Sequence, residues 1–71
     1  MDMRRLVGDN AARIRKQRGL TQEEVAERSQ LSQQYLSGIE RGQRNPSLLS
    51  MERLAAALEV DLTNLVEKGE R

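Results

Sequence analysis

Residues 22–39 read QEEVAERSQLSQQYLSGI, and this stretch decides the fold that we predict for the chain. It contains two short helical patterns joined by a tight turn around Gln30. The small Ala26 lies where the second helix must cross the first at close range, and a larger side chain there would force the two apart. Together with the apolar residues, these features predict a helix-turn-helix motif over about residues 21–41. The apolar residues are Val25, Leu31, Leu36 and Ile39.

Capping signals mark where both helices begin. Thr21, followed three residues later by Glu24, forms a capping box for the first helix, which should end near Ser29. Ser32 is the expected N-cap of the second helix, and Gly42 ends it. The face of the second helix that points away from the core then carries Gln33, Gln34, Ser37 and Arg41.

Apolar spacing predicts one more helix before this motif and two after it. The first runs from about Met3 to Arg18 and is stopped by Gly19. Its inner face carries Val7, Ala11 and Ile14.

The fourth helix begins behind Pro46 and Ser47, and a short fifth helix runs from Leu62 to about Glu67 with Asp61 as its cap. Leu65 is the main inner residue of the fifth helix. The inner stripe of the fourth helix consists of Leu48, Met51, Leu54, Ala55 and Leu58.

These elements predict an all-α fold, a compact five-helix bundle made of one domain over residues 1–71. A chain of this length buries only about 60% of the surface of its unfolded form, so association with a second copy would help to stabilise it.

The composition excludes several classes of function. The chain has no Cys and no His, which removes thiol nucleophiles, the usual general base and the commonest zinc ligands. The sequence also has no phosphate-binding glycine loop and no evident pair of carboxylates in a cleft. We therefore expect no enzymatic activity, no cofactor and no metal site. The longest apolar run, Leu54 to Leu58, is far too short for a membrane span, so we expect a cytoplasmic protein.

The charges are unevenly placed although the net charge is only +1. Residues 1–18 carry six Lys or Arg against two Asp, and residues 41–53 carry three Arg against one Glu. These two basic segments flank the acidic segment that contains the two predicted helices. Nucleic acid is therefore indicated by the distribution of charge and not by its sum.

Three segments of the chain, IRKQRGLTQEEVAERSQLS, YLSGIERGQRNPSL and ERLAAALEV, resemble the Cro and lambda-repressor-like family of XRE-type helix-turn-helix proteins. The resemblance covers residues 7–66 and implies a five-helix DNA-binding domain. One departure is Gln30, where many relatives place Gly in the turn. A residue other than Gly at positive φ is strained by about 1–2 kcal/mol.

Gln33 and Gln34 are expected to read DNA bases, because a helix in the major groove presents its N-terminal residues to base edges. A carboxamide pairs bidentately with N6 and N7 of adenine. The similarity to lambdoid phage repressors with a Gln-Gln pair here implies half-sites that contain adenine, with supporting contacts from Ser32 and Ser37. The alternative is that these polar residues simply occupy a solvated first turn.

Several other residues are expected to contact DNA phosphates. Gln22 lies at the start of a helix, where free N–H groups and the helix dipole favour an anion, and the family uses this position as a backbone clamp. The resemblance places the loop after the second helix along the phosphates, unless its polar side chains serve only solubility. Tyr35 should combine packing with a phosphate contact. The loop residues are Arg41, Gln43, Arg44 and Asn45.

Two further residues are expected to form a structural ion pair, and three others are expected to form a dimer contact. Arg15 and Glu40 lie near apolar helix faces, and relatives pair them across the interior. Leu49, Val60 and Val66 lie off or at the edge of the inner stripes, so they are our proposed dimer contact, with scattered surface apolar residues as the alternative.

A two-fold dimer would place two copies of the helix that carries Gln33 and Gln34 in successive major grooves, about 34 Å apart, over a palindromic operator. The sequence therefore favours a small dimeric transcription regulator, similar both to phage repressors and to restriction-modification controller proteins. It would act by excluding RNA polymerase or by touching it, in the second case through Glu23 and Glu27. The alternative is a protein-interaction module, such as an antitoxin, or the DNA-binding fragment of a longer regulator.

Overall fold

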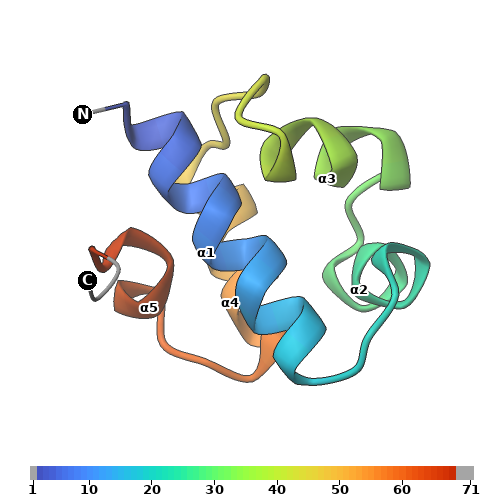
Figure 1. The fold of residues 1–71 in the computed structure, drawn as a ribbon. Helices are drawn as coiled ribbons and strands as arrows, with labels where there is room; N and C mark the ends of the chain where they lie inside the picture. Colours follow the sequence, from blue (N-terminus) through green and yellow to red (C-terminus); the bar gives the residue numbers. More distant parts are fainter. Residues whose placement is uncertain (1, 69–71) are drawn as a thin grey trace.

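The computed structural model describes residues 2–68, which fold into five α-helices without a strand (Figure 1). The all-α, five-helix prediction is therefore confirmed. The helices are α1 (Met3–Gln17), α2 (Gln22–Ser29), α3 (Gln33–Glu40), α4 (Leu48–Leu58) and α5 (Thr63–Val66).

α1 runs through the middle of the molecule in Figure 1, with α5 on one side and α3 on the other. α2 packs against both α3 and α4, so every helix contributes to one hydrophobic core. This arrangement leaves the first turn of α3 at the surface. The largest fully buried side chains are Leu36, Ile39, Leu54, Leu58, Leu65 and Val25.

The crossing of α1 and α3 depends on a glycine that the sequence analysis did not single out. Gly8 is buried, and a Cβ at this position would overlap the backbone carbonyl oxygen of Ile39. Only glycine allows the two helix backbones to approach this closely. The position of α3 relative to the rest of the fold therefore depends on Gly8.

The predicted caps are present on α2 and α3. The Glu24 N–H donates to Thr21 Oγ1 at 3.0 Å and the Thr21 N–H donates to Glu24 Oε1 at 2.8 Å, which completes the capping box. That second bond lowers the pKa of the Glu24 carboxyl below its ordinary value. Ser32 caps α3 by accepting the Tyr35 N–H at 3.0 Å. Both helices of the motif thus begin where local sequence fixes them.

Two expectations about the C-terminal half are wrong. Asp61 does not cap α5, which begins at Thr63; instead the Asn64 side chain accepts the Asp61 N–H at 3.0 Å. Leu48 is not an inner residue, because its side chain is 61% exposed. The core extends along α4 only as far as Met51, so the first turn of α4 projects beyond it.

Among residues 2–68, two residues other than glycine adopt the left-handed conformation at helix ends. Gln30 follows α2 with φ 63°, as the departure from the family pattern suggested, and Glu59 follows α4 with φ 62°. Each carries a side chain where glycine would relieve a steric conflict of about 1–2 kcal/mol. The strain at Glu59 was not predicted from the sequence.

We expect Glu59→Gly to stabilise the fold by about 1 kcal/mol, because Gly adopts this conformation without the Cβ conflict. In a chain of this size the melting temperature should rise by about 4–8 °C in a circular dichroism melt. The matched control is Glu52→Gly, an exposed position inside α4, which should lower stability by about 1 kcal/mol. A lower melting temperature for Glu59→Gly would contradict the explanation.

Candidate nucleic-acid interface

The two glutamines form the exposed N-terminal turn of α3. Gln33 and Gln34 are the first two residues of the helix, and both are exposed. Ser37 is half-buried and lies one helical turn further along the same side. Ser32 is exposed, but its hydroxyl already accepts the capping N–H of Tyr35. The carboxamides are therefore the longest polar side chains at this end of the helix.

The turn between α2 and α3 is held by a buried serine. Ser29 Oγ donates to the Ala26 carbonyl at 3.2 Å and accepts the Leu31 N–H at 3.4 Å. The Leu31 N–H also donates to the Ala26 carbonyl at 3.2 Å, so the chain reverses within a few residues. Ala26 is 6% exposed, in keeping with the close crossing expected at this position. From the sequence, Ser29 was predicted only to mark the end of its helix.

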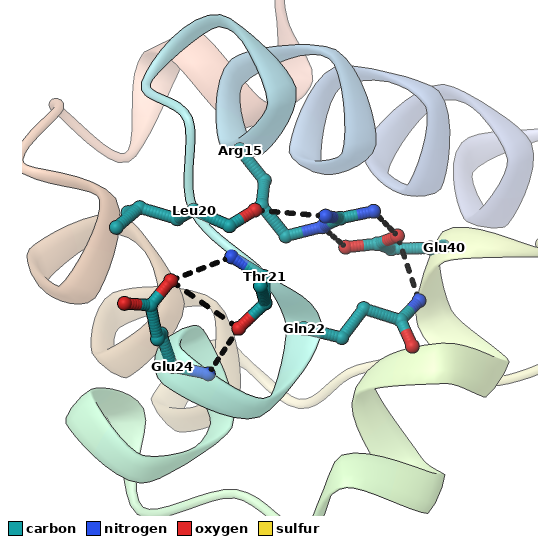
Figure 2. Close-up of polar contacts among 6 residues, drawn as sticks. All are labelled: Arg15, Leu20, Thr21, Gln22, Glu24 and Glu40. Carbon is teal, nitrogen blue, oxygen red and sulfur yellow. Dashed lines mark hydrogen bonds and ion pairs between the residues drawn. The ribbon is translucent and has the colours of Figure 1, made fainter.

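Figure 2 shows a polar cluster that joins α1, α2 and α3. Arg15 Nε donates to Glu40 Oε2 at 2.8 Å, and Arg15 Nη2 donates to Glu40 Oε1 at 3.0 Å. Arg15 Nη1 donates to the Leu20 carbonyl at 2.9 Å. The Arg15 and Glu40 side chains are only 13% and 6% exposed. The pair implied by the family resemblance is thus a bidentate, nearly buried ion pair.

Gln22 belongs to the same cluster, which the sequence analysis did not anticipate. Its Nε2 donates to Glu40 Oε1 at 3.0 Å, so Glu40 accepts three hydrogen bonds from two helices (Figure 2). This bond uses one of the two N–H groups on Nε2 and fixes the direction of the carboxamide. The second N–H of Nε2 is not used in this bond, and the first backbone N–H groups of α2 have no acceptor within the helix.

We expect Glu40→Ala to destabilise the fold by on the order of 3 kcal/mol, because it leaves the Arg15 guanidinium nearly buried without its counter-charge. Urea unfolding followed by circular dichroism measures the change. The matched control is Glu27→Ala, an exposed carboxylate on α2, which should change stability by at most about 0.5 kcal/mol. Equal losses in the two variants would show that the cluster contributes nothing specific.

The loop after α3 folds back onto the end of that helix. The Gln43 and Arg44 N–H groups both donate to the Gly38 carbonyl, at 2.9 and 3.2 Å. Gly42 has φ 74°, and its N–H donates to the Ile39 carbonyl at 3.0 Å. The backbone of the loop is thereby fixed while its polar side chains remain at the surface. The exposed side chains are Arg41, Gln43, Arg44 and Asn45.

Arg5 lies beside this loop although 36 residues separate it from Gly42 in the sequence. A Cβ at Gly42 would lie 3.5 Å from Arg5 Cα and 3.6 Å from Arg5 Nε. The exposed Arg5 thus extends the cationic surface formed by Arg41 and Arg44. In the sequence, the basic character of residues 1–18 is the one feature that points to Arg5.

Tyr35 packs as expected but directs its hydroxyl to the protein. The ring is half-buried against the core, and the hydroxyl donates to Ser50 Oγ on α4 at 3.3 Å. Ser47 Oγ donates to the same Ser50 Oγ at 3.0 Å. Tyr35 therefore connects α3 to the start of α4.

The three residues proposed for self-association differ in exposure. Leu49 is 55% exposed at the start of α4, next to the exposed Leu48. Val60 and Val66 are half-buried and pack against the core. Val60 also lines a hollow of about 360 Å³ beside Arg13, Arg18 and Glu67. Leu49 is thus the member of the three most available to another molecule.

Asn10 is a buried polar residue that fixes α5, and the sequence analysis missed it. Its side chain, in a residue only 3% exposed, donates to the Leu65 and Glu67 carbonyls, each at 2.8 Å. Arg13 Nη2 donates to Asn10 Oδ1 at 3.0 Å. The side-chain nitrogen and oxygen of Asn10 therefore both have hydrogen-bond partners. Burying Asn10 thus stabilises the junction of α1 and α5.

Across residues 2–68, no three His, Cys, Asp or Glu side chains lie close enough together to hold a metal ion. Nor does this part of the chain contain a helix long and apolar enough to cross a membrane.

Two short helices that cross at a tight turn, with exposed polar residues opening the second, define a helix-turn-helix protein. The chain belongs to the XRE-type helix-turn-helix family, whose sequence model, described as helix-turn-helix, matches residues 12–65. The resemblance drawn from the sequence is thus confirmed.

The chain is similar to several regulators of this family. It is 59% identical over 66 residues to the uncharacterized HTH-type transcriptional regulator y4dJ of Sinorhizobium fredii, covering 93% of this chain and 86% of that protein. It is 45% identical over 60 residues to the immunity repressor of Bacillus phage phi105, covering 84% of this chain but 42% of the repressor. The restriction-modification controller protein C.AhdI of Aeromonas hydrophila superposes with a TM-score of 0.85 at 39% identity, covering 87% of this chain and 94% of that one.

Proposed function

We propose that the chain is a transcription regulator that binds double-stranded DNA at a specific sequence, as a homodimer on a palindromic operator. The observation that carries the proposal is the pair of exposed carboxamides at the start of α3. The ion-paired cluster at the other end of α3, around Glu40, fixes this helix against α1 and α2. Its relatives are named as a transcriptional regulator and a repressor, which supports a role in transcription regulation and not an enzymatic activity.

Base recognition belongs to the first turn of α3. The major groove is about 12 Å wide and admits an α-helix. Gln33 and Gln34 extend from that helix toward base edges, where a carboxamide recognises adenine through paired donor and acceptor groups. Ser32 and Ser37 flank them and supply shorter contacts.

Phosphate contacts come from both sides of the recognition helix. Gln22 presents its remaining N–H and the start of α2 to one phosphate, while Arg41, Gln43, Arg44 and Asn45 approach the backbone beyond α3. Arg5 adds a cation next to this loop. The Tyr35 hydroxyl remains a phosphate donor only if it leaves Ser50.

The dimer contact is centred on Leu49, with Val60 and Val66 at its margin. A two-fold axis would place the two recognition helices about 34 Å apart on one side of the duplex. Binding there would exclude RNA polymerase from an overlapping promoter. The exposed carboxylates of Glu23 and Glu27 on α2 offer a polymerase contact for activation instead. Such a protein would act in the cytoplasm, where bacterial DNA is found.

The operator is found first by selecting from a random-duplex pool at ~0.15 M salt. We then expect Gln33→Ala to relax the preference at one position of each half-site by ~1–3 kcal/mol, because the bidentate contact to the base is lost. Competition between operator and single-base variants measures this change. Gln17→Ala, an exposed glutamine on α1, is the matched control and should leave the preference unaltered. Equal weakening by Gln33→Ala on every sequence would refute its base-reading role.

We expect Leu49→Asp to sediment as a monomer at concentrations where the wild type is dimeric, since a carboxylate would be desolvated in an apolar contact. Analytical ultracentrifugation measures the association. Met3→Asp is the matched control, because Met3 is similarly exposed on α1 and should leave the dimer intact. Val60 and Val66 are unsuitable for this test because both pack against the core. A Leu49→Asp variant that remains dimeric would move the interface elsewhere.

A further inference from the structure

Gly38 lies inside the recognition helix, where glycine is among the least favourable residues. It follows Gln34 by four residues, so the two positions lie on the same side of α3, one turn apart. Gln34 is exposed but Gly38 is buried, because the side chain of Arg44 covers it. The strip of α3 in line with the base-reading carboxamide is therefore occupied by an arginine from the following loop.

The contact leaves no room for a side chain at position 38 while Arg44 keeps its present conformation. A Cβ there would lie 2.5 Å from Arg44 Cγ and 3.5 Å from Arg44 Cδ and Nε. Optimal separation between carbon atoms is about 3.5–4.0 Å, so at least Arg44 Cγ would have to move. The aliphatic part of Arg44 thus occupies the space left by the missing side chain.

The backbone prevents Arg44 from simply shifting outward. Its N–H donates to the carbonyl of the same Gly38 at 3.2 Å, and the neighbouring Gln43 N–H donates there at 2.9 Å. The start of the arginine side chain is therefore anchored directly above the glycine. If position 38 carried a Cβ, Arg44 would have to adopt another rotamer, which redirects the guanidinium.

We propose that Gly38 is a positioning residue for DNA binding, which holds Arg44 against α3 so that its guanidinium meets the phosphate flanking the base read by Gln34. This inference rests on the proposed function. An arginine whose stem is already packed loses less conformational freedom on binding than one free in solvent. Gly38 thus contributes to phosphate affinity without touching DNA itself.

The test is a cycle of Gly38→Ala, Arg44→Ala and the double variant, measured by fluorescence anisotropy on the selected operator over a range of salt concentrations. The logarithm of the association constant falls as the logarithm of the salt concentration rises. Loss of one phosphate contact makes this slope less negative by about 0.9, which corresponds to about a fivefold weaker affinity at 0.15 M salt. We expect both single variants to show this loss, and the double variant to bind no more weakly than Arg44→Ala.

A melting experiment on the same four proteins tests the packing without DNA. In the Arg44→Ala background, Gly38→Ala should raise the melting temperature, because only the gain in helix propensity remains. When Arg44 is present, the same substitution should raise the melting temperature less, or lower it, because the new Cβ meets the Arg44 side chain. The same rise in both backgrounds would overturn the inferred contact.

Three further outcomes separate this inference from the proposed function. A wild type that binds the operator and a Gly38→Ala variant with an unchanged salt slope would overturn the inference alone. Additional weakening by Gly38→Ala in the Arg44→Ala background would also overturn it, because the glycine would then approach DNA directly. A wild type that selects no duplex would overturn the proposed function, and the positioning role with it.

Discussion

The carboxylate of Glu40 is the point on which the arrangement of the binding surface depends. It lies at the end of α3 and accepts hydrogen bonds from Arg15 on α1 and Gln22 on α2. A bundle of about 70 residues has little core with which to fix helix orientation, so one nearly buried charged group that joins three helices has a large effect. The hydrogen bond from Gln22 Nε2 to Glu40 also orients the Gln22 carboxamide at the start of α2. Glu40 therefore links the packing of the three helices to the orientation of the Gln22 side chain.

Glycines and small residues determine how closely the helices approach. Gly8 allows the backbone of α1 to meet that of α3, and Ala26 allows α2 to cross α3 beside the turn. Gly38 leaves room on α3 for the stem of Arg44. At each of these positions an absent or small side chain leaves the space that a neighbour occupies. α3 is thus held by backbone proximity on one side and covered by an arginine on another.

The polar surface around α3 brings together segments that are far apart in the chain. Arg5 from the first helix lies beside the Gly42 turn, and Arg41 and Arg44 follow the recognition helix. The net charge of +1 conceals this concentration, since the acidic residues of α2 and of the C-terminal segment offset it. Local positive potential, and not the sum of charges, is what a phosphate backbone meets at close range.

The sequence by itself determined what depends on neighbours within one or two helical turns. Helix starts at Thr21 and Ser32, the turn at Gln30 and the exposure of Gln33 and Gln34 all follow from caps, apolar spacing and helix geometry. Tertiary structure alone decided which distant groups meet: Asn10 with α5, Gln22 with Glu40, and Arg5 with the Gly42 turn. It also decided that α4 projects beyond the core at Leu48. A helical pattern specifies which residues share a face, whereas their partners and their burial depend on how the helices pack in three dimensions.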